Sequence, residues 1–351
     1  MRKLKVMCML RVTAIPRKLL LQNPFHIAHG SSDYRENVFL QIIHDSNVAY
    51  GEAAVVPYYG ITKEQILQDL KQTITAEMIL KREALTAVKR FSHSMSACAY
   101  TSAIQALVMQ QSGPALAGSL EKQYQRGSSF TISYRADVQK MLDSIRTCGF
   151  STIKLKAGFP DDVQRIRLIR QHFPDLVIRL DANQGWNFEQ ACNIISELNT
   201  LNIELIEEPI KGTVDEIRML SELSEIPILL DETVQNAEDL RRYAPSVSGI
   251  VVKLAKSGGP QAARVLIAEA KQLGLEVMLS CMIESSLGIA HALTLEPLCK
   301  WIDLDAPTLL AEDVFSGLTY QDELPRCSIS SLVPSDGLLQ AFAMAKPFIE
   351  E

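Results

Sequence analysis

The chain has 351 residues, of which 47% are apolar and 22% are charged, so it can bury the hydrophobic core of one large domain or of two. Its 35 basic and 41 acidic residues give a formal net charge of −6 and are spread along the sequence, which argues against a nucleic-acid partner. Because no apolar run reaches the length of about 18 residues that a membrane-spanning helix needs, no membrane partner is expected.

The first residues of the chain, MRKLKVMCMLRV at 1–12, share only a basic start with signal sequences. Arg11 ends the apolar stretch too early for a signal peptide, and we interpret the segment as the first strand. The seven cysteines are scattered, lack C-x-x-C pairs and mostly have apolar neighbours. These features favour reduced, buried thiols in a cytoplasmic protein.

Residues 1–125 predict a small α+β unit. Two alternating segments, 3–15 and 36–55, are typical of antiparallel strands, and the second contains an Asp-Ser-Asn turn. Apolar residues then recur at helical spacing over 63–78 and 97–111, which predicts two helices that complete this unit.

From residue 126 the pattern changes to strands that alternate with helices. Strands are expected at 130–134, 152–157, 176–181, 203–209, 226–231, 248–254, 276–281 and 300–305. Helices are expected at 136–148, 161–172, 187–199, 213–224 and 259–273. This alternation predicts an α/β protein with parallel βα units, and the number of strands indicates a closed barrel over 126–320. The chemistry of such a barrel gathers at the carboxyl ends of its strands.

Three of these consecutive strands end in an acidic residue, namely Asp181, Glu207 and Asp231. Any one of these acids could simply cap the helix that follows its strand. Three in register would instead converge on one rim, where their mutual repulsion would be costly unless a cation compensated it. Ligands that are all oxygen favour Mg²⁺ or Mn²⁺ over zinc, so the sequence predicts a site for a hard divalent cation.

Lysines accompany the acids on two strands. Lys154 and Lys156 lie on one face of the strand at 152–157, because side chains alternate along a strand. Lys253 ends the sixth strand, on the opposite side of the barrel, and with Lys156 could form an acid/base pair. Two alternatives remain open. The glycines at 258–259 could open a phosphate-binding helix, and a strand lysine could form a Schiff base.

Five motifs together resemble the enolase superfamily, in its muconate lactonizing subgroup. They are KLK at 154–156, DANQGW at 181–186, EEP at 207–209, DET at 231–233 and KLAKSGG at 253–259, and GEA at 51–53 is similar to that family's capping domain. The resemblance implies a (β/α) barrel of the modified TIM type behind an N-terminal α+β capping domain. It also implies that the last segment, 321–351, returns to the capping domain.

The resemblance further implies the chemistry of the site. Mg²⁺, with Mn²⁺ as a substitute, would be bound by the three strand-end carboxylates named above. Lys156 and Lys253 would move a proton at the α-carbon of the substrate through an enediolate, and Lys154 would polarise the substrate carboxylate. The segment CMIES at 281–285 is similar to the family's seventh-strand segment, so Cys281, Met282 and Glu284 are expected to contact the substrate. Ser133, on the first barrel strand, is expected to contact it as well.

Two carboxylates on the last predicted strand bear on the reaction. Asp303 and Asp305 share a face and could cap the following helix, but as a pair they can receive an ammonium group. This D-x-D pattern resembles the signature of the dipeptide epimerases, where it holds the amino terminus of the substrate. Muconate cycloisomerases, o-succinylbenzoate synthases and N-acylamino acid racemases, whose substrates lack that amine, are the alternatives. A non-catalytic relative that binds a metal and a small acid is a third hypothesis.

The loop that contains His26 departs from the pattern of the alanyl-glutamate epimerases, which carry an arginine there for the distal carboxylate. A histidine cannot make the same bidentate contact with a carboxylate. Alternatively, His26 could simply pack in the loop. In neither case is a preference for an acidic second residue expected. His29 and Arg35 are other candidate cations. The predicted partner is thus a dipeptide of unspecified side chains, and a homo-oligomer is compatible with the sequence.

Overall fold

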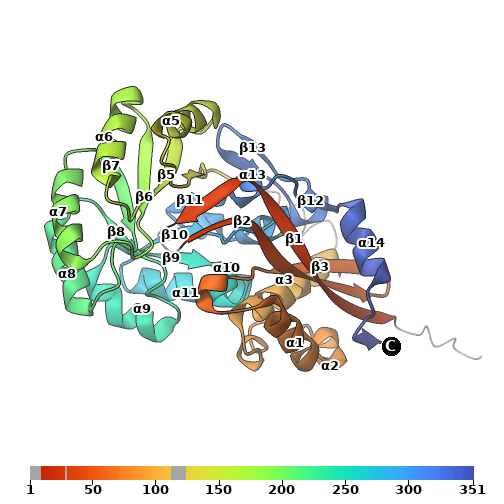
Figure 1. The fold of residues 1–351 in the computed structure, drawn as a ribbon. Helices are drawn as coiled ribbons and strands as arrows, with labels where there is room; N and C mark the ends of the chain where they lie inside the picture. Colours follow the sequence, from red (N-terminus) through yellow and green to blue (C-terminus); the bar gives the residue numbers. More distant parts are fainter. Residues whose placement is uncertain (1–8, 28–29, 112–123) are drawn as a thin grey trace, which may run out of the picture.

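The computed structural model describes residues 9–27, 30–111 and 124–351, which form an antiparallel sheet and a parallel barrel (Figure 1). The antiparallel sheet has the order β16-β1-β2-β3. Its strands are β1 (Leu10–Ile27), β2 (Gly30–His44), β3 (Asn47–Ala53) and β16 (Ile349–Glu350). The last of these pairs with β1, so the C-terminus returns to the first sheet. The domain boundaries near 125 and 320 stay predictions.

Three helices accompany this sheet: α1 (Lys63–Thr73), α2 (Ala76–Leu80) and α3 (Ser94–Gln111). The single helix predicted over 63–78 is wrong, because the chain breaks at Ile74, whose backbone is extended. Thr75 then starts a new helix by accepting a hydrogen bond from the Met78 amide. Against β3, α3 packs so closely that a Cβ atom on Gly51 would lie 1.8 Å from the carbonyl oxygen of Ala99. This contact explains the glycine of the GEA motif.

The barrel contains eight parallel strands in the order β11-β10-β9-β8-β7-β6-β5-β4, and a bridge between Ser128 and Ile302 joins its two edges. The strands are β4 (Phe130–Ile132), β5 (Thr152–Lys156), β6 (Val177–Asp181), β7 (Ile203–Glu207), β8 (Ile228–Leu230), β9 (Gly249–Lys253), β10 (Glu276–Ser280) and β11 (Trp301–Asp303). Each lies within a predicted strand, but several are shorter: the last ends at Asp303, so Asp305 lies beyond it, at the start of a helix. The fold class, a (β/α) barrel with an N-terminal antiparallel sheet domain, is confirmed.

Helices surround the barrel (Figure 1). The five predicted ones are α5 (Val138–Thr147), α6 (Asp162–His172), α7 (Phe188–Leu198), α8 (Val214–Leu223) and α11 (Pro260–Gln272). Four shorter ones, which were not predicted, are α9 (Ala237–Tyr243), α10 (Leu254–Ser257), α12 (Ser286–Leu293) and α13 (Ala306–Leu309). After the barrel come two small strand pairs, β12 (Phe315–Ser316) with β15 (Val333–Pro334) and β13 (Thr319–Gln321) with β14 (Leu324–Arg326), and helix α14 (Asp336–Met344). None of the helices in the described part of the chain is long and apolar enough to cross a membrane.

Alternation along the barrel strands separates two cores. Residues such as Ile153 and Leu155 belong to the large cluster that packs the strands against the helices. Side chains on the other face of the strands point into the barrel and form a separate small cluster: Leu205, Leu229, Val251, Met278 and Trp301. Apolar side chains therefore fill the barrel below the rim formed by the carboxyl ends of its strands. Polar and charged side chains can lie at the rim itself.

Candidate active site

The inward-facing side chains become charged toward the carboxyl ends of the strands. Two positions beyond the apolar cluster on three neighbouring strands stand Glu207, Asp231 and Lys253. Strand register places Asp181 opposite Glu207, and Lys156 opposite Asp181. All five side chains are buried, since none of these residues is more than 8% exposed. The structure thus brings the predicted acids and lysines to one rim.

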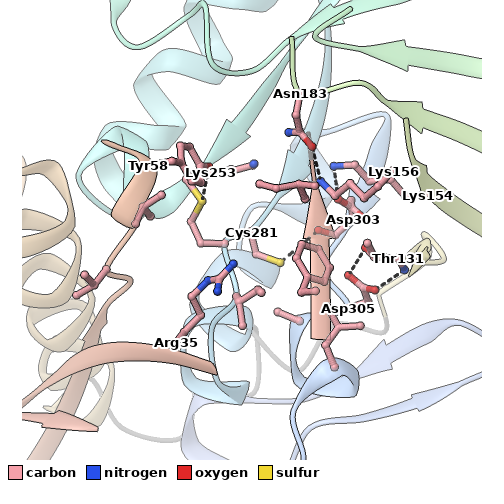
Figure 2. A pocket seen from close by; sticks show the side chains of 18 residues that line it. Arg35, Tyr58, Thr131, Lys154, Lys156, Asn183, Lys253, Cys281, Asp303 and Asp305 are labelled. Atoms are coloured by element: carbon pink, nitrogen blue, oxygen red, sulfur yellow. Dashed lines mark hydrogen bonds and ion pairs between the residues drawn. The ribbon is translucent and has the colours of Figure 1, made fainter. Parts of the chain in front are cut away.

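Lys156 and Lys253 stand on opposite sides of this rim, because β5 and β9 are four strands apart in an eight-stranded barrel. Both line one cavity, and Figure 2 shows them on two sides of it. The Nζ atom of Lys156 donates to Asp181 at 2.5 Å, and that of Lys253 donates to Asp231 at 2.5 Å. Burial disfavours the ammonium form of Lys253, but Asp231, Tyr58 and Glu207 together outweigh that effect and raise the pKa of this lysine.

Lys154 lies deeper and joins three carboxylates. Its Nζ atom is 3.0 Å from Asp181, 2.7 Å from Glu207 and 2.9 Å from Asp303. Burial opposes its charge, but the three acids together raise the pKa of Lys154 well above its usual value. The electrostatic cost of placing Lys154 and Lys156 side by side is therefore offset by the acids around them.

The three predicted metal ligands stand at, or directly after, the ends of the neighbouring strands β6, β7 and β8. In residues 9–27, 30–111 and 124–351 no group of three or more His, Cys, Asp or Glu side chains is already arranged around one point as metal ligands. Glu207, however, is fully buried, and neither of its oxygens accepts a hydrogen bond, although Lys154 approaches as an ion pair. Burial, and then repulsion from Asp181, raise the pKa of Glu207. Lys154 supplies a single positive charge beside Glu207 and leaves its oxygens without a hydrogen bond, so these carboxylates fit a hard divalent ion as a further cation.

Residues beside these carboxylates hold them in place, and sequence reasoning did not single them out. Asn183 and Glu208 have positive φ angles of 45° and 43°, which are uncommon away from glycine. Glu208 accepts a hydrogen bond from the Asp231 amide at 2.7 Å. Asn183 accepts one from Lys156 at 3.3 Å and donates to Glu232 at 2.9 Å. The DANQGW, EEP and DET motifs that contain these residues were the available signal.

Lys256 and the glycine pair have structural partners. The Nζ atom of Lys256 donates to a carboxylate oxygen of Asp231, on the side not used by Lys253. Gly259 has a φ of 105°, and a Cβ atom there would lie 1.9 Å from the hydroxyl of Thr101 in α3. Thr101 in turn donates to the carbonyl of Gly258 at 3.0 Å. The glycines therefore allow α3 to pack against the start of α11, which explains them without a phosphate.

Asp303 and Asp305 both line the cavity but have different partners. Asp303 accepts from Ser129 at 2.6 Å and from Ser280 and Lys154 at 2.9 Å. Burial opposes its charge, but Lys154 and these donors lower the pKa of Asp303. Within the described part of the chain, Asp305 accepts only from the amide and hydroxyl of Thr131, and burial followed by repulsion from Asp303 raises its pKa to about 7. Of the two acids, Asp305 is the one that forms no ion pair with a described residue.

The other predicted substrate contacts divide into two groups. Cys281 and Met282 line the cavity that the lysines also line, and Figure 2 labels the first of them. Ser133 and His26 line neighbouring depressions instead, and Glu284 is buried with one oxygen accepting from the Met282 amide. Of the alternative cations, Arg35 lines the cavity, whereas His29 lies outside the described residues. Sequence reasoning missed further lining residues: Phe25, Ile27, Val55, Val56, Tyr58, Thr131, Asn183, Ile283, Ala306 and Leu309.

A buried cluster of Asn37, Glu52 and Ser285 joins the antiparallel sheet to the segment that follows β10. Glu52 accepts from Asn37 at 2.7 Å and from the amide and hydroxyl of Ser285. Asn37 also donates to the carbonyl of Ile283 and accepts from the Val55 amide. Because Ile283 and Val55 line the cavity from the barrel and from the sheet, the Asn37–Glu52–Ser285 cluster holds two walls of the cavity together.

Comparison with known proteins agrees with this arrangement of carboxylates and lysines at a barrel rim. The family model described as Enolase C-terminal domain-like matches residues 135–323. The chain belongs to this family. Among curated proteins, the L-Ala-D/L-amino acid epimerase of Flavobacterium johnsoniae is 30% identical over 313 residues, which cover 87% of this chain and 93% of the relative. The L-Ala-D/L-Glu epimerase of Bacteroides thetaiotaomicron is 30% identical over 320 residues, or 88% of this chain and 83% of the relative.

Solved structures of this enolase-like family extend the likeness. The dipeptide epimerase of Cytophaga hutchinsonii, complexed with Mg and the dipeptide D-Ala-L-Val, has a TM-score of 0.85 and 25% identity, and the match covers 95% of this chain and 98% of that one. The L-Ala-D/L-Glu epimerase of Bacillus subtilis has a TM-score of 0.81 and 26% identity, with 94% and 98% covered. The predicted resemblance to dipeptide epimerases of the enolase superfamily, and the isomerase class, are confirmed.

Proposed function

We propose that the protein epimerises a dipeptide at the α-carbon of its second residue. The observation that carries this proposal is the placement of Lys156 and Lys253, which are buried and face one cavity from opposite sides of the barrel. Inversion of a carbon centre by proton transfer needs a base on one face and an acid on the other. The names of the relatives, which include several dipeptide epimerases, support the same reaction.

The proton transfers balance between the two lysines. The neutral amine of one lysine takes the α-proton, and the electrons of the broken C–H bond move into the substrate carboxylate to give an enediolate. The ammonium group of the other lysine then donates a proton to the opposite face of the same carbon. The two lysines finish with exchanged protonation states, which solvent resets before the next turnover in the same direction.

The amino terminus of the dipeptide would lie at Asp305 and Asp303. Asp305 has no cationic partner in residues 9–27, 30–111 and 124–351, and its pKa is raised to about 7, so an ammonium group nearby would stabilise its ionised form. Asp303 would contribute charge while it continues to hold Lys154. Synthase, acylamino acid racemase and cycloisomerase substrates lack this amine, and a protein that only bound a small acid would not need two opposed lysines.

The residues that would hold a divalent cation are Asp181, Glu207 and Asp231. This assignment is supported by the oxygens of Glu207, which accept no hydrogen bond from a described residue. It is also supported by the Mg-bound structures of neighbours such as the Cytophaga hutchinsonii epimerase. When bound, Mg²⁺ or Mn²⁺ would supply electrophilic stabilisation of the negative charge that develops on the substrate carboxylate. Lys154, among the same carboxylates, would add a fixed positive charge to this end of the site.

The test is a stereochemical screen of dipeptides in deuterated water with Mg²⁺, followed by NMR. We expect loss of the α-proton signal of the second residue and appearance of its epimer, while the first residue stays unlabelled. Chelation should abolish the exchange, and added Mg²⁺ or Mn²⁺ should restore it. The proposal fails if N-acetyl or N-succinyl amino acids are better substrates than all free dipeptides, or if a rigorously metal-free preparation keeps full activity.

A further inference from the structure

Arg35 on β2 belongs to the cavity wall that the antiparallel sheet contributes. It lines the cavity together with Val55 and Met282, and Figure 2 shows its guanidinium group pointing inward, toward Cys281. The side chain is neither fully buried nor fully exposed. Burial lowers the pKa of Arg35, but a guanidinium group stays protonated, so a positive charge remains in partly apolar surroundings.

The guanidinium group of Arg35 has no carboxylate partner among the described residues. One of its terminal nitrogens donates a hydrogen bond to the carbonyl oxygen of Tyr34, at 2.9 Å. The neighbouring acid in the sequence, Glu36, is instead paired with Lys63 at 2.7 Å. Because a partly desolvated arginine is stabilised by a carboxylate that accepts two of its hydrogen bonds, its spare donors suit an anion in the cavity.

The position of Arg35 within the cavity decides which part of a substrate it could meet. In Figure 2, Thr131 and Asp305 lie beyond Cys281 from Arg35, so the arginine is on the side of the cavity away from the proposed amine site. The reacting carbon would stand between Lys156 and Lys253. A side chain on that carbon, if directed away from the amine site, would face the part of the cavity wall that contains Arg35 and Val55.

We infer that Arg35 binds an anionic side chain on the second residue of the substrate, so that dipeptides whose second residue is glutamate or aspartate are preferred. This inference rests on the proposed function. It replaces the expectation drawn from His26, which lines a different depression, beside Tyr134 and Lys140. The preferred substrate is then defined by two charges at opposite ends of the cavity, an ammonium group at Asp305 and a carboxylate at Arg35.

The experiment compares L-Ala-L-Glu with its uncharged isostere L-Ala-L-Gln in wild type, Arg35→Met, Arg35→Lys and His26→Ala. The readout is the ratio of kcat/KM for the two dipeptides, which cancels general losses of folding or catalysis. We expect a ratio of about 10 to 100 in wild type, from the usual strength of charge-assisted hydrogen bonds. The ratio should fall to near one in Arg35→Met, recover in part in Arg35→Lys and remain as in wild type in His26→Ala.

The outcomes separate this inference from the proposed function. If no dipeptide exchanges its α-proton in wild type, the proposed function itself is wrong. If exchange occurs but wild type does not distinguish Glu from Gln, or if Arg35→Met keeps the distinction, Arg35 does not read the second side chain. Loss of the distinction in His26→Ala alone would assign that role to His26 instead.

Discussion

At the scale of single residues, the site shows how neighbours decide what an identical side chain can do. Asp303 and Asp305 both line the cavity, yet Asp303 is held by Lys154 and two serines, while among the described residues Asp305 accepts hydrogen bonds only from Thr131. As a consequence, the pKa of Asp303 is lowered and that of Asp305 is raised to about 7. Asp303 maintains the arrangement of the site, and Asp305 is the acid that an arriving ammonium group would stabilise.

The first prediction concerns Asp305→Asn, which keeps the shape of the side chain and removes its charge. We expect kcat/KM for a free dipeptide to fall by about tenfold to a hundredfold, because a charge-assisted hydrogen bond is lost. The same substrate with an acetylated amine should be turned over poorly by wild type and variant alike. Asp322→Asn, in an exposed turn where φ is 49°, is the matched control and should keep wild-type kinetics. An equal loss on free and acetylated dipeptides would contradict the amine site.

At the scale of elements, the sequence predicted the barrel well because its signals are local. Each strand is a short apolar run, and in the helices between them apolar residues recur at helical spacing over ten or more positions. The short helices α9, α10, α12 and α13 were missed because so few residues give little periodicity. The break at Ile74 was missed because a capping threonine, rather than glycine or proline, marks it. The acids and lysines of the rim were found because each stands at a strand end.

The cluster of Asn37, Glu52 and Ser285 lies beyond such local signals, since it joins elements distant in the sequence. Next to it, burial and then repulsion from Glu52 raise the pKa of Glu284 to about 8. The folded state therefore holds a proton on Glu284 that the unfolded chain releases above its ordinary pKa of about 4.3. By linkage, the stabilisation from this group is fully present below that value and is lost as pH rises through about 8.

The second prediction follows from this loss of stability with rising pH. The melting temperature of wild type should fall from pH 5.5 to 8.5, with Glu284 contributing up to about 1.4 kcal/mol per pH unit. Glu284→Gln mimics the protonated acid, so its melting temperature should fall less over the same range. The measurement is thermal unfolding of both proteins by circular dichroism in matched buffers. Parallel profiles for the two proteins would show that Glu284 is already ionised in the fold.

At the scale of the whole molecule, the cavity is made where two separately predictable parts meet. Local patterns could not place Phe25, Ile27 and Arg35 of β1 and β2 in the wall of the cavity at the barrel mouth, because that placement depends on contacts between residues far apart in the sequence. His26 was selected as the specificity residue from its position in the loop, yet the structure places it in a neighbouring depression and Arg35 in the cavity. Residues on the antiparallel sheet therefore need the tertiary structure before a role can be argued for them.

The opposed lysines are the central claim, and one measurement tests them directly. Lys156→Ala and Lys253→Ala are each incubated with L,L and L,D isomers of one dipeptide in deuterated water, and deuterium at the second α-carbon is followed by NMR. Each variant should lose net epimerisation, because both faces need a proton-transfer group, yet still exchange the isomer presented to its remaining lysine. Lys300→Ala, an exposed lysine paired with Glu276, should exchange both isomers as wild type does. Opposite isomers labelled by the two variants would support the account, whereas the same isomer labelled by both would contradict it.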